Sequence, residues 1–221
     1  IVAISSREHV AAGLKADGTV LLAGKTLFSD TSWEQWTNMV QVVINSTSNN
    51  EAVIGLGSNR KIKIAGSFFY DTSLLALENI VAIGVGEGEI PFFAALDTDE
   101  TLHWFSMDNT TGMTVADVDK FAVGYQHLIY IKKDGTIVVE RNPDVPENWN
   151  LDDTEGLDGN LIEAIAAGNS HNLYLMDESI IIKGVTNQNW TTLPAELSGT
   201  HEPVIAVAAG RRHSVALLKA E

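Results

Sequence analysis

Hydrophobic residues recur along this chain in short stretches of five to seven residues, in which apolar side chains alternate with small or polar ones. Val and Ile are frequent in these stretches, and none keeps a helical spacing of apolar residues over ten positions. Both the length and the alternation are typical of β-strands. The pattern therefore predicts an all-β chain.

The stretches come in groups of three, and each group forms one repeat. A repeat begins with an apolar stretch that ends in a small residue, continues with a short alternating stretch, and ends with a third stretch after a tight turn. The sixth repeat has no third stretch in the sequence and is expected to be incomplete. The six apolar stretches begin at Ile1, Val40, Ile80, Val118, Ile162 and Val204.

Two turns punctuate each repeat. The second and third stretches are separated by Asp-Gly or a related pair, and these turns are 42, 40, 35 and 44 residues apart along the chain. Asp and Gly tolerate positive φ, so we expect type I′ hairpins here. The first and second stretches are joined by a turn of the form Gly-x-x-His in several repeats. Each repeat is thus predicted to be a three-stranded antiparallel meander.

One three-stranded sheet cannot bury both of its faces, whereas sheets stacked around an axis can. We therefore predict a single domain over residues 1–221, a β-propeller of about six three-stranded repeats with the last incomplete. A flat β-solenoid is the alternative, but solenoids usually have shorter periods.

Three repeats share one frame. It reads VIAVAAGRRHSVAL over 204–217, IEAIAAGNSHNLYL over 162–175 and VDKFAVGYQHLIYI over 118–131. The frame resembles the repeat of the regulator of chromosome condensation family, and its short period is similar to that of compact bacterial and viral members, among them a propeller-type β-lactamase inhibitor. The resemblance implies a β-propeller. It leaves the function open, because members serve as exchange factors, inhibitors, adhesive modules and structural appendages.

Three repeats depart from the frame. The second has neither the Gly nor the His, and the third is expected to carry Glu89 at the histidine position. The first has Arg7 in place of the Gly and Val10 in place of the His.

Composition excludes several function classes. The net charge is −15, from 29 acidic and 14 basic residues, which disfavours nucleic acid as a partner. There is no cysteine, and so no disulfide, cysteine-ligated zinc site or thiol nucleophile. The longest apolar runs, such as residues 90–96, are too short to cross a bilayer. We expect no membrane insertion.

Candidate chemistry is sparse. His127, His171 and His213 occupy one repeat position, and the two interpretations are a metal site or a structural role. A structural role, in which each ring caps a turn or bonds backbone, is favoured because equivalent positions in adjacent blades are too far apart to share one ion. Ser214 lacks a G-x-S-x-G elbow. The acidic loops 97–100 and 150–160 lack calcium-loop spacing, and we interpret them as solvated. No catalytic residue, metal site or cofactor is predicted.

Tryptophans gather in the linkers between repeats. Trp33, Trp36, Trp149 and Trp190 lie there, and Trp104 lies in a predicted strand. Linker tryptophans either fill gaps between blades or form a binding surface, and the first is favoured because it buries more apolar area.

The residues inside the Gly-x-x-His turns vary from repeat to repeat. Because every repeat runs the same way, these turns should emerge on one face, where a rigid scaffold displays them for binding. Turn residues that simply vary without function are the alternative interpretation. The predicted partner-binding residues are Glu8, His9, Glu87, Tyr125, Gln126, Asn169, Ser170, Arg211 and Arg212.

These observations predict a non-catalytic protein-interaction module whose partner is another protein. The alternatives are a structural or receptor-binding appendage of a bacteriophage particle, within a larger assembly, and a glycan-binding propeller. An extracellular or virion-associated location is expected.

Overall fold

A computed structural model of the chain describes residues 1–7, 9–25, 29–46, 51–68, 71–86, 92–106, 109–142, 150–184, 203–210 and 213–219.

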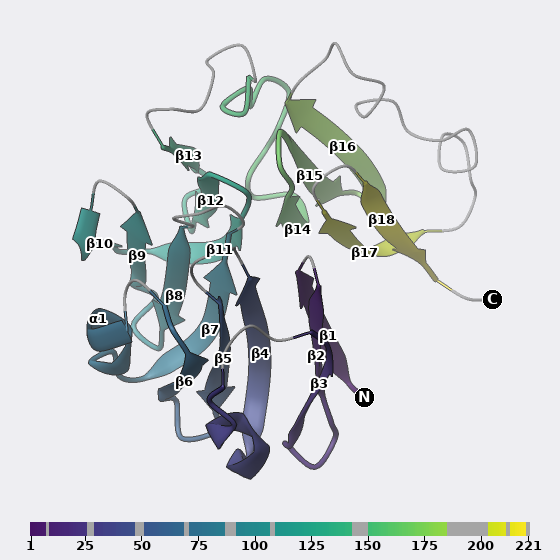
Figure 1. Ribbon diagram of the computed structural model, residues 1–221. Helices are drawn as coiled ribbons and strands as arrows, with labels where there is room; N and C mark the ends of the chain where they lie inside the picture. The colour runs from purple at the N-terminus through teal and green to yellow at the C-terminus, as the bar shows by residue number, and fades with distance from the viewer. Residues whose placement is uncertain are drawn as a thin grey trace. The chain divides into compact units, whose positions relative to one another are not determined.

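The described chain is almost entirely β-structure, as predicted (Figure 1). Its strands form six antiparallel sheets, numbered here sheet 1 to sheet 6 in chain order, and within each sheet strands adjacent in sequence are hydrogen-bonded neighbours. Two short helical segments, η1 (Ser32–Gln35) and α1 (Asp71–Leu75), lie between strands. No helix among the described residues is long and apolar enough to span a membrane.

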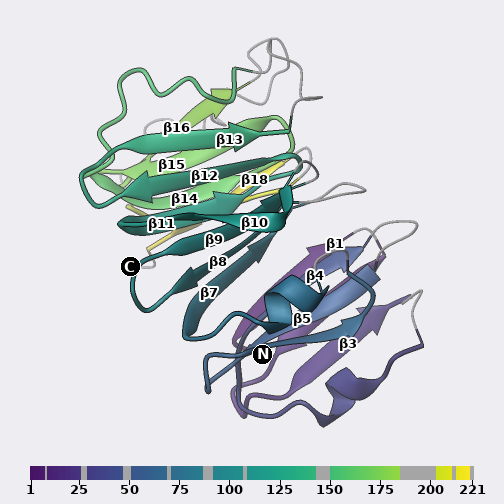
Figure 2. The ribbon, with the colours of Figure 1, turned by 90° about the vertical axis from the view of Figure 1, so that its left-hand side faces the viewer.

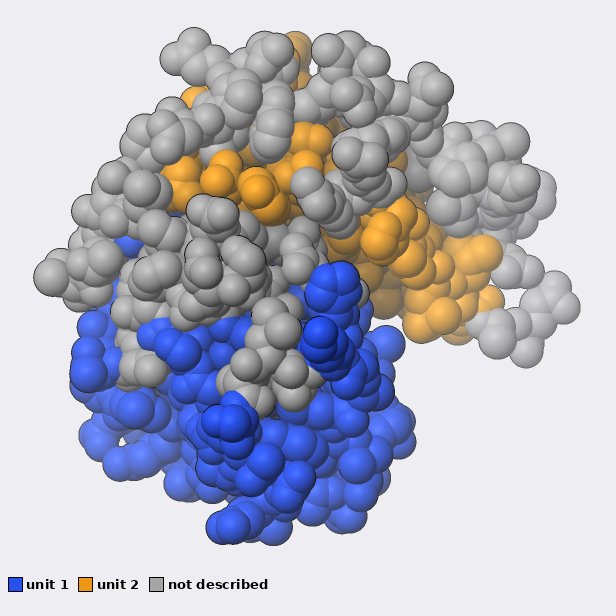
Figure 3. All heavy atoms as spheres, in the orientation of Figure 1, with its two compact units in different colours: residues 1–116 blue, residues 117–221 orange. Residues whose placement is uncertain are grey.

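The chain divides into two compact units, residues 1–116 and 117–221 (Figure 3). The first unit holds sheets 1 to 3; Figure 2 shows β7, β8 and β9 of sheet 3 side by side. Its strands are β1 (Ala3–Arg7), β2 (Val10–Leu14) and β3 (Val20–Gly24); β4 (Met39–Ser46), β5 (Glu51–Gly57) and β6 (Ile62–Gly66); β7 (Ile80–Val85), β8 (Phe93–Asp97), β9 (Leu102–Ser106) and β10 (Asn109–Val115).

The second unit holds sheets 4 to 6. Sheet 6 has two strands among the described residues, which agrees with the incomplete last repeat of the prediction. The strands are β11 (Val118–Val123), β12 (His127–Lys132) and β13 (Ile137–Arg141); β14 (Ile162–Ala167), β15 (His171–Met176) and β16 (Ser179–Gly184); β17 (Val204–Ala209) and β18 (Ser214–Leu218).

Sheet 3 differs from the prediction because it has a fourth strand, β10, which pairs antiparallel with β9. Its register shifts between Asn109 and Met113, and Gly112 lies in that interval with φ of 86°. The irregular pairing interrupts the alternation from which strands are recognised in a sequence. This explains why the pattern did not predict β10.

Most of the hairpins between second and third strands have a longer loop than expected, of another type. In sheet 1 the amide of Gly18 donates to Lys15 O at 3.0 Å and the amide of Lys15 donates to Thr19 O at 2.9 Å. This is a three-residue loop, a type I turn closed by one residue with positive φ. Asp17 supports it by accepting from the Thr19 amide at 3.0 Å, and its hydrogen bonds with Thr19 lower the pKa of Asp17.

The same loop recurs in sheets 2, 3 and 4, so the predicted type I′ turn is wrong for sheets 1 to 4. It is correct for sheet 5, where two consecutive residues have positive φ, Asp177 at 50° and Glu178 at 59°. In the other four hairpins only the last loop residue has positive φ: Gly18, Arg60, Glu100 and Gly135.

The carbonyl of that last loop residue links the hairpin to the next sheet. Gly18 O accepts from the Met39 amide at 3.0 Å, and Arg60 O accepts from the Ile80 amide at 3.0 Å. In the second unit Glu178 O accepts from the Val204 amide at 3.3 Å. Each of these bonds fixes the start of one first strand against the preceding hairpin.

Apolar side chains fill the spaces between neighbouring sheets. Between sheets 1 and 2, Trp36 is 5% exposed and packs with Val10, Met39 and Val53. A Cβ on Gly55 would lie 2.8 Å from the Trp36 ring, so the glycine makes room for the indole. Trp36 therefore fills a gap between blades, as predicted; Trp149 and Trp190 lie outside the described residues.

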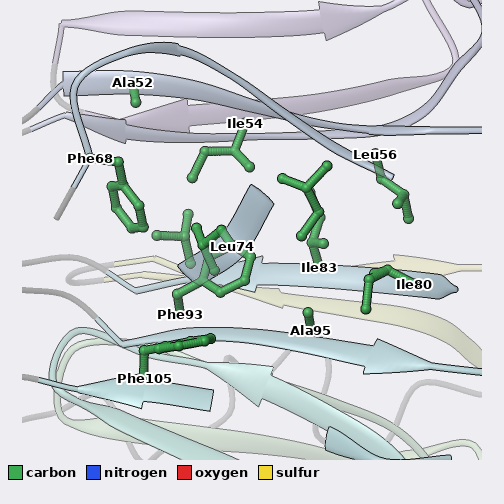
Figure 4. Packing of buried hydrophobic residues seen from close by; sticks show 12 residues of the cluster. Ala52, Ile54, Leu56, Phe68, Leu74, Ile80, Ile83, Phe93, Ala95 and Phe105 are labelled. Atoms are coloured by element: carbon green, nitrogen blue, oxygen red, sulfur yellow. The ribbon is translucent and has the colours of Figure 1, made fainter. Parts of the chain in front are cut away.

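A second cluster lies between sheets 2 and 3, with residues from β5, β7 and β8 facing one another (Figure 4). Ile54 and Phe93 are both 0% exposed there. In the second unit, Ile129 and Ile131 of sheet 4 pack against Tyr174 and Ile162 of sheet 5. Apolar side chains are thus buried between sheets 1 and 2, between sheets 2 and 3, and between sheets 4 and 5.

Candidate functional site

The Gly-x-x-His turns of the second compact unit share one closed geometry. The amide of Gly124 donates to His127 O, that of Gly168 to His171 O, and that of Gly210 to the carbonyl of the last histidine, each at 2.9 Å. Two residues stand between the glycine and the histidine in each of these turns, and their identity differs from turn to turn.

Glycine is required because other atoms occupy the place of a side chain. A Cβ on Gly124 would lie 2.7 Å from His127 Nδ1 and 2.6 Å from Gly168 O. A Cβ on Gly168 would lie 2.8 Å from both His171 Nδ1 and Gly210 O. Each turn is therefore packed against its own histidine and against the turn of the next sheet.

The histidines join neighbouring sheets through their side chains. Nε2 of His127 lies 2.7 Å from Asn172 Oδ1, and Asn172 Nδ2 donates to Leu151 O at 2.9 Å. Because the amide nitrogen is used as a donor, the Asn172 oxygen accepts and the His127 proton lies on Nε2. Nε2 of His171 is 3.0 Å from Ser214 Oγ, which repeats the link in the next sheet.

Burial keeps these imidazoles neutral. His127 is 0% exposed, and loss of hydration lowers its pKa from 6.5 to about 4 although the bond to Asn172 acts in the opposite direction. Burial, and to a smaller extent the charge of His213, also lowers the pKa of His171. The predicted structural role is correct for His127 and His171, but the expected partner was a turn or backbone, and the observed partner is a side chain of the next sheet. His213 is exposed.

A backbone bond also links the first two of these turns. The amide of Tyr125 donates to Gly168 O at 3.0 Å. Tyr125, Gln126 and Asn169 are each half-buried, so part of every side chain reaches solvent from a fixed backbone. The structure brings these three predicted site residues onto consecutive, mutually bonded turns.

The remaining predicted site residues are buried, lie in the first unit, or fall outside the described residues. Ser170 is only 5% exposed, so the expectation that it is an exposed turn residue is wrong. Its carbonyl lies against Gly184, at the end of β16, where it occupies the place that a Cβ on Gly184 would take. His9 is exposed in the first unit. Glu8, Glu87, Arg211 and Arg212 lie outside the described residues.

The first unit joins its sheets without histidine. Arg7, at the glycine position, donates from Nη2 to Val85 O at 2.7 Å and from Nε to Ile44 O at 3.3 Å. Gln41 donates from Nε2 to Ile83 O at 2.6 Å and accepts from the Ile83 amide at 2.8 Å. The backbone groups bonded here belong to first strands and point away from the second strand of their own sheet. The side chains of Arg7 and Gln41 satisfy these groups, a role that the sequence pattern did not indicate.

In sheet 3, the residue at the histidine position differs from the prediction. Gly86 donates to Phe92 O at 2.8 Å, so Phe92 and not Glu89 stands at the histidine position. The turn is three residues longer than in the other repeats, which shifts the register by that number. Phe92 is 1% exposed and packs on Trp104 with ring centroids 5.7 Å apart, an apolar replacement for the polar link.

The described acidic loops use their carboxylates locally. Asp153 accepts from the Glu155 amide at 3.0 Å and from Lys183 Nζ at 3.1 Å. Asp97 pairs with His103 at 2.8 Å; burial alone would raise the pKa of Asp97, but the hydrogen bonds that it accepts outweigh burial and lower it. Within the described ranges, no three His, Asp or Glu side chains gather closely enough to hold a metal ion.

Solved structures similar to this chain are β-propellers. The ectodomain of the Physcomitrella patens receptor kinase CR4 matches with a TM-score of 0.72 at 13% identity over 98% of this chain. Prp20p of Saccharomyces cerevisiae matches with a TM-score of 0.72 at 15% identity, also over 98% of this chain. Yeast RCC1 (Prp20) bound to Kap60 matches with a TM-score of 0.61 at 16% identity over 97%.

These similarities establish the fold. The chain is a β-propeller of about six blades, the last of them incomplete among the described residues. It spans 60% of the length of the CR4 ectodomain, 68% of Prp20p and 67% of the Kap60-bound RCC1 chain. No model of a protein family matches the sequence, and no curated protein matches it.

Proposed function

We propose that this chain is a non-catalytic protein-interaction module that binds a partner protein through the Gly-x-x-His turns of its second compact unit. The observation that carries the proposal is the bond from the Tyr125 amide to Gly168 O, at 3.0 Å, together with the His127 link to Asn172. These bonds hold successive turns in fixed positions, so little conformational entropy is lost when a partner binds.

The chemistry of the turns fits protein recognition. Tyr125 and Gln126 are half-buried, so an aromatic ring and an amide that both donates and accepts stand at the first turn. Asn169 is half-buried as well, but its Oδ1 is enclosed and does not accept from a partner. Arg211 and Arg212 stand at the equivalent place in the last repeat of the sequence. Tyr and Arg are the residue types most often found to dominate interface energetics. Ser170 is left out of the proposed contact set because it is buried.

The similar structures support this class of function by analogy. Prp20p has binding properties toward Gsp1p and histones, and yeast RCC1 (Prp20) has been captured with Kap60 bound. Their sequence identities of 15% and 16% are too low to transfer a partner to this chain. The phage-appendage role, the glycan-binding role and the extracellular or virion-associated location stay predictions from the sequence.

The test compares capture by matched variants. The immobilised chain and its Tyr125→Ala/Arg212→Ala variant are exposed to the same host lysate, and bound proteins are quantified by mass spectrometry. A true partner is lost from the variant, and its affinity for the purified variant falls by about 30-fold, or about 2 kcal/mol. Both proteins should melt at nearly the same temperature, because Tyr125 lies in a turn and is only half-buried.

A control pair addresses the opposite turns. Asp17→Asn/Asp134→Asn removes two charges while keeping the side-chain oxygens that accept from the Thr19 and Thr136 amides. The control should bind the partner like the wild type. If the control loses the partner and the Tyr125/Arg212 variant retains it, the binding face has been assigned to the wrong end of the sheets.

A further inference from the structure

Two hairpins are hydrogen-bonded to the start of β7 in the first compact unit. Arg60 O, in the hairpin of sheet 2, accepts from the Ile80 amide at 3.0 Å, and the amide of Thr98, in the hairpin of sheet 3, donates to Asn79 O at 3.0 Å. Leu56, which precedes the hairpin of sheet 2, lies at the same end of the buried cluster as Ile80 (Figure 4). The two hairpins are therefore fixed next to each other.

These two hairpins carry opposite charges. In sheet 2, Arg60, Lys61 and Lys63 are exposed, and no acidic residue occurs between positions 57 and 66. In sheet 3, Asp99 is exposed and Glu100 is half-buried, and no basic residue occurs between positions 96 and 102. The hairpins of sheets 1 and 4, by contrast, combine lysine with aspartate. A basic and an acidic hairpin thus stand side by side on one surface.

One residue of each charge occupies a backbone position that favours glycine. Arg60 has φ of 63° and Glu100 has φ of 62°, whereas Gly18 and Gly135 stand at the same loop position in sheets 1 and 4. A residue with a side chain is strained in this conformation. Backbone strain gathers at sites where a side chain serves a function. We therefore attribute the two charges to recognition and not to folding of the loops.

An apolar side chain is exposed beside the charges. The register between β7 and β8 shifts between Ile80 and Ala82, so Val81 is the extra residue of a β-bulge. A bulge redirects a side chain, and Val81 is 45% exposed although it lies within a strand. The two hairpins and this valine form one surface with a basic, an acidic and an apolar part. This bipolar surface consists of Arg60, Lys61, Lys63, Val81, Asp99 and Glu100.

The arrangement of charges indicates which partner fits. It must bring an acidic group to the basic hairpin and a basic group to the acidic hairpin. A second copy of this chain does both when it is rotated by half a turn, because two-fold symmetry places the same surface of each copy against the other. The net charge of −15 on each copy opposes association. That repulsion is screened beyond about 8 Å at physiological ionic strength, whereas partly buried pairs in contact are screened much less.

We propose that the bipolar surface binds a second copy of the chain in a two-fold symmetric dimer. Arg60 of each copy faces Glu100 of the other, and Val81 is covered. Lys61 is already paired with Glu78 at 3.0 Å, so Arg60 is the principal cation of the contact. Two hairpins bury a small area, and the dimer is accordingly weak and reversible. The surface lies at the end of the sheets opposite the Gly-x-x-His turns, and the inference does not rest on the function proposed above.

Charge reversal at the two matched loop positions tests the dimer. Arg60→Glu makes both hairpins acidic, and Glu100→Arg makes the second hairpin more basic. Each new residue is the one that the other hairpin carries at nearly the same φ, so the loops should keep their conformation. Dimerisation is measured by sedimentation equilibrium at protein concentrations up to about 1 mM, as a weak interface requires. Lys25→Glu, exposed at the other end of sheet 1, changes the net charge as Arg60→Glu does and is the control.

The wild type is expected to form a reversible dimer as its concentration rises. Each reversal should weaken this dimer by at least about tenfold, because two like-charged contacts arise at once. An equimolar mixture of Arg60→Glu and Glu100→Arg should form a heterodimer of nearly wild-type affinity, since both of its contacts again join an acid and a base. Lys25→Glu and Tyr125→Ala should dimerise like the wild type.

Three results would overturn the proposal. The first is a wild type that stays monomeric at every concentration, which would mean that a second copy does not occupy the surface. The second is a dimer that Lys25→Glu weakens as much as Arg60→Glu does, which would reflect net charge or another face. The third is weakening by both reversals without recovery in the mixture, which would exclude the two-fold arrangement. If Glu100→Arg lowers the melting temperature, Asp99→Arg replaces it in each comparison.

Discussion

The link between His127 and Asn172 predicts a specific pattern of stability in mutants. Asn172 is 0% exposed, and it satisfies both the His127 Nε2 proton and Leu151 O. In Asn172→Val, the His127 Nε2–H donor and the Leu151 carbonyl lose these hydrogen bonds in the protein interior. Each unsatisfied buried polar group costs about 1–3 kcal/mol, so we expect Asn172→Val to lower the free energy of unfolding by about 2–5 kcal/mol at pH 7.

Removing both partners should cost less than the sum of the single changes. The first unit shows why, since the positions equivalent to His127 and Asn172 in sheets 1 and 2 are Val10 and Val53, which pack in one buried cluster. In His127→Val/Asn172→Val the unpaired imidazole is gone, and two apolar side chains meet. The double variant should therefore be more stable than additivity predicts by at least about 1 kcal/mol.

Urea unfolding followed by circular dichroism gives all four free energies of the cycle. Leu14→Val, in the other compact unit, is the control partner for His127→Val, and this pair should be additive within about 0.5 kcal/mol. Additivity within the same limit for His127→Val and Asn172→Val would refute the reasoning. It would mean that the side chains do not depend on one another for hydrogen bonding in the folded protein.

Three further predictions concern pH, the hairpins and the core. The folded-state pKa of His127 is about 4, below the 6.5 of an unfolded chain. The stability that neutral His127 contributes is therefore complete above pH 6.5 and is lost as pH falls toward 4, at up to about 1.4 kcal/mol per pH unit. When urea unfolding is measured across this pH range, the His127→Val/Asn172→Val variant should show a flatter profile of stability against pH. Arg60→Gly should stabilise the chain by about 0.5–1 kcal/mol, because Arg60 has a positive φ of 63° that glycine adopts without strain. Gly18→Ala should destabilise it, because φ is 77° there and the new Cβ would lie 2.8 Å from the backbone of Asn38. Melting temperatures that change in the same direction in the two variants would contradict this prediction. Trp36→Ala should cost about 3–5 kcal/mol by opening a cavity between sheets 1 and 2, and an unchanged melting temperature would show that the indole does not fill that gap.

Much of the candidate site was accessible from sequence because it lies in the constant frame. The repeat predicted where the turns fall, and it predicted that Gly124, Gly168 and Gly210 are needed there. It could not predict that Ser170 is buried, because the exposure of a turn residue depends on the neighbouring chain that packs on it. The roles of Arg7 and Gln41 were missed for the same reason, since their partners are backbone atoms of other sheets.

The sequence by itself determined the number of repeats and three strands in each of the first five, but not β10 of sheet 3. These follow from alternation of apolar residues and from turn residues, and both are local properties that nearby positions specify. Register within a turn and partners between sheets were decided only in the tertiary structure. Phe92, and not Glu89, takes the histidine position because its carbonyl accepts from the Gly86 amide. His127 bonds Asn172 because the stacking of sheets brings together side chains 45 positions apart. Such pairings depend on three-dimensional proximity, which no periodicity along one chain encodes.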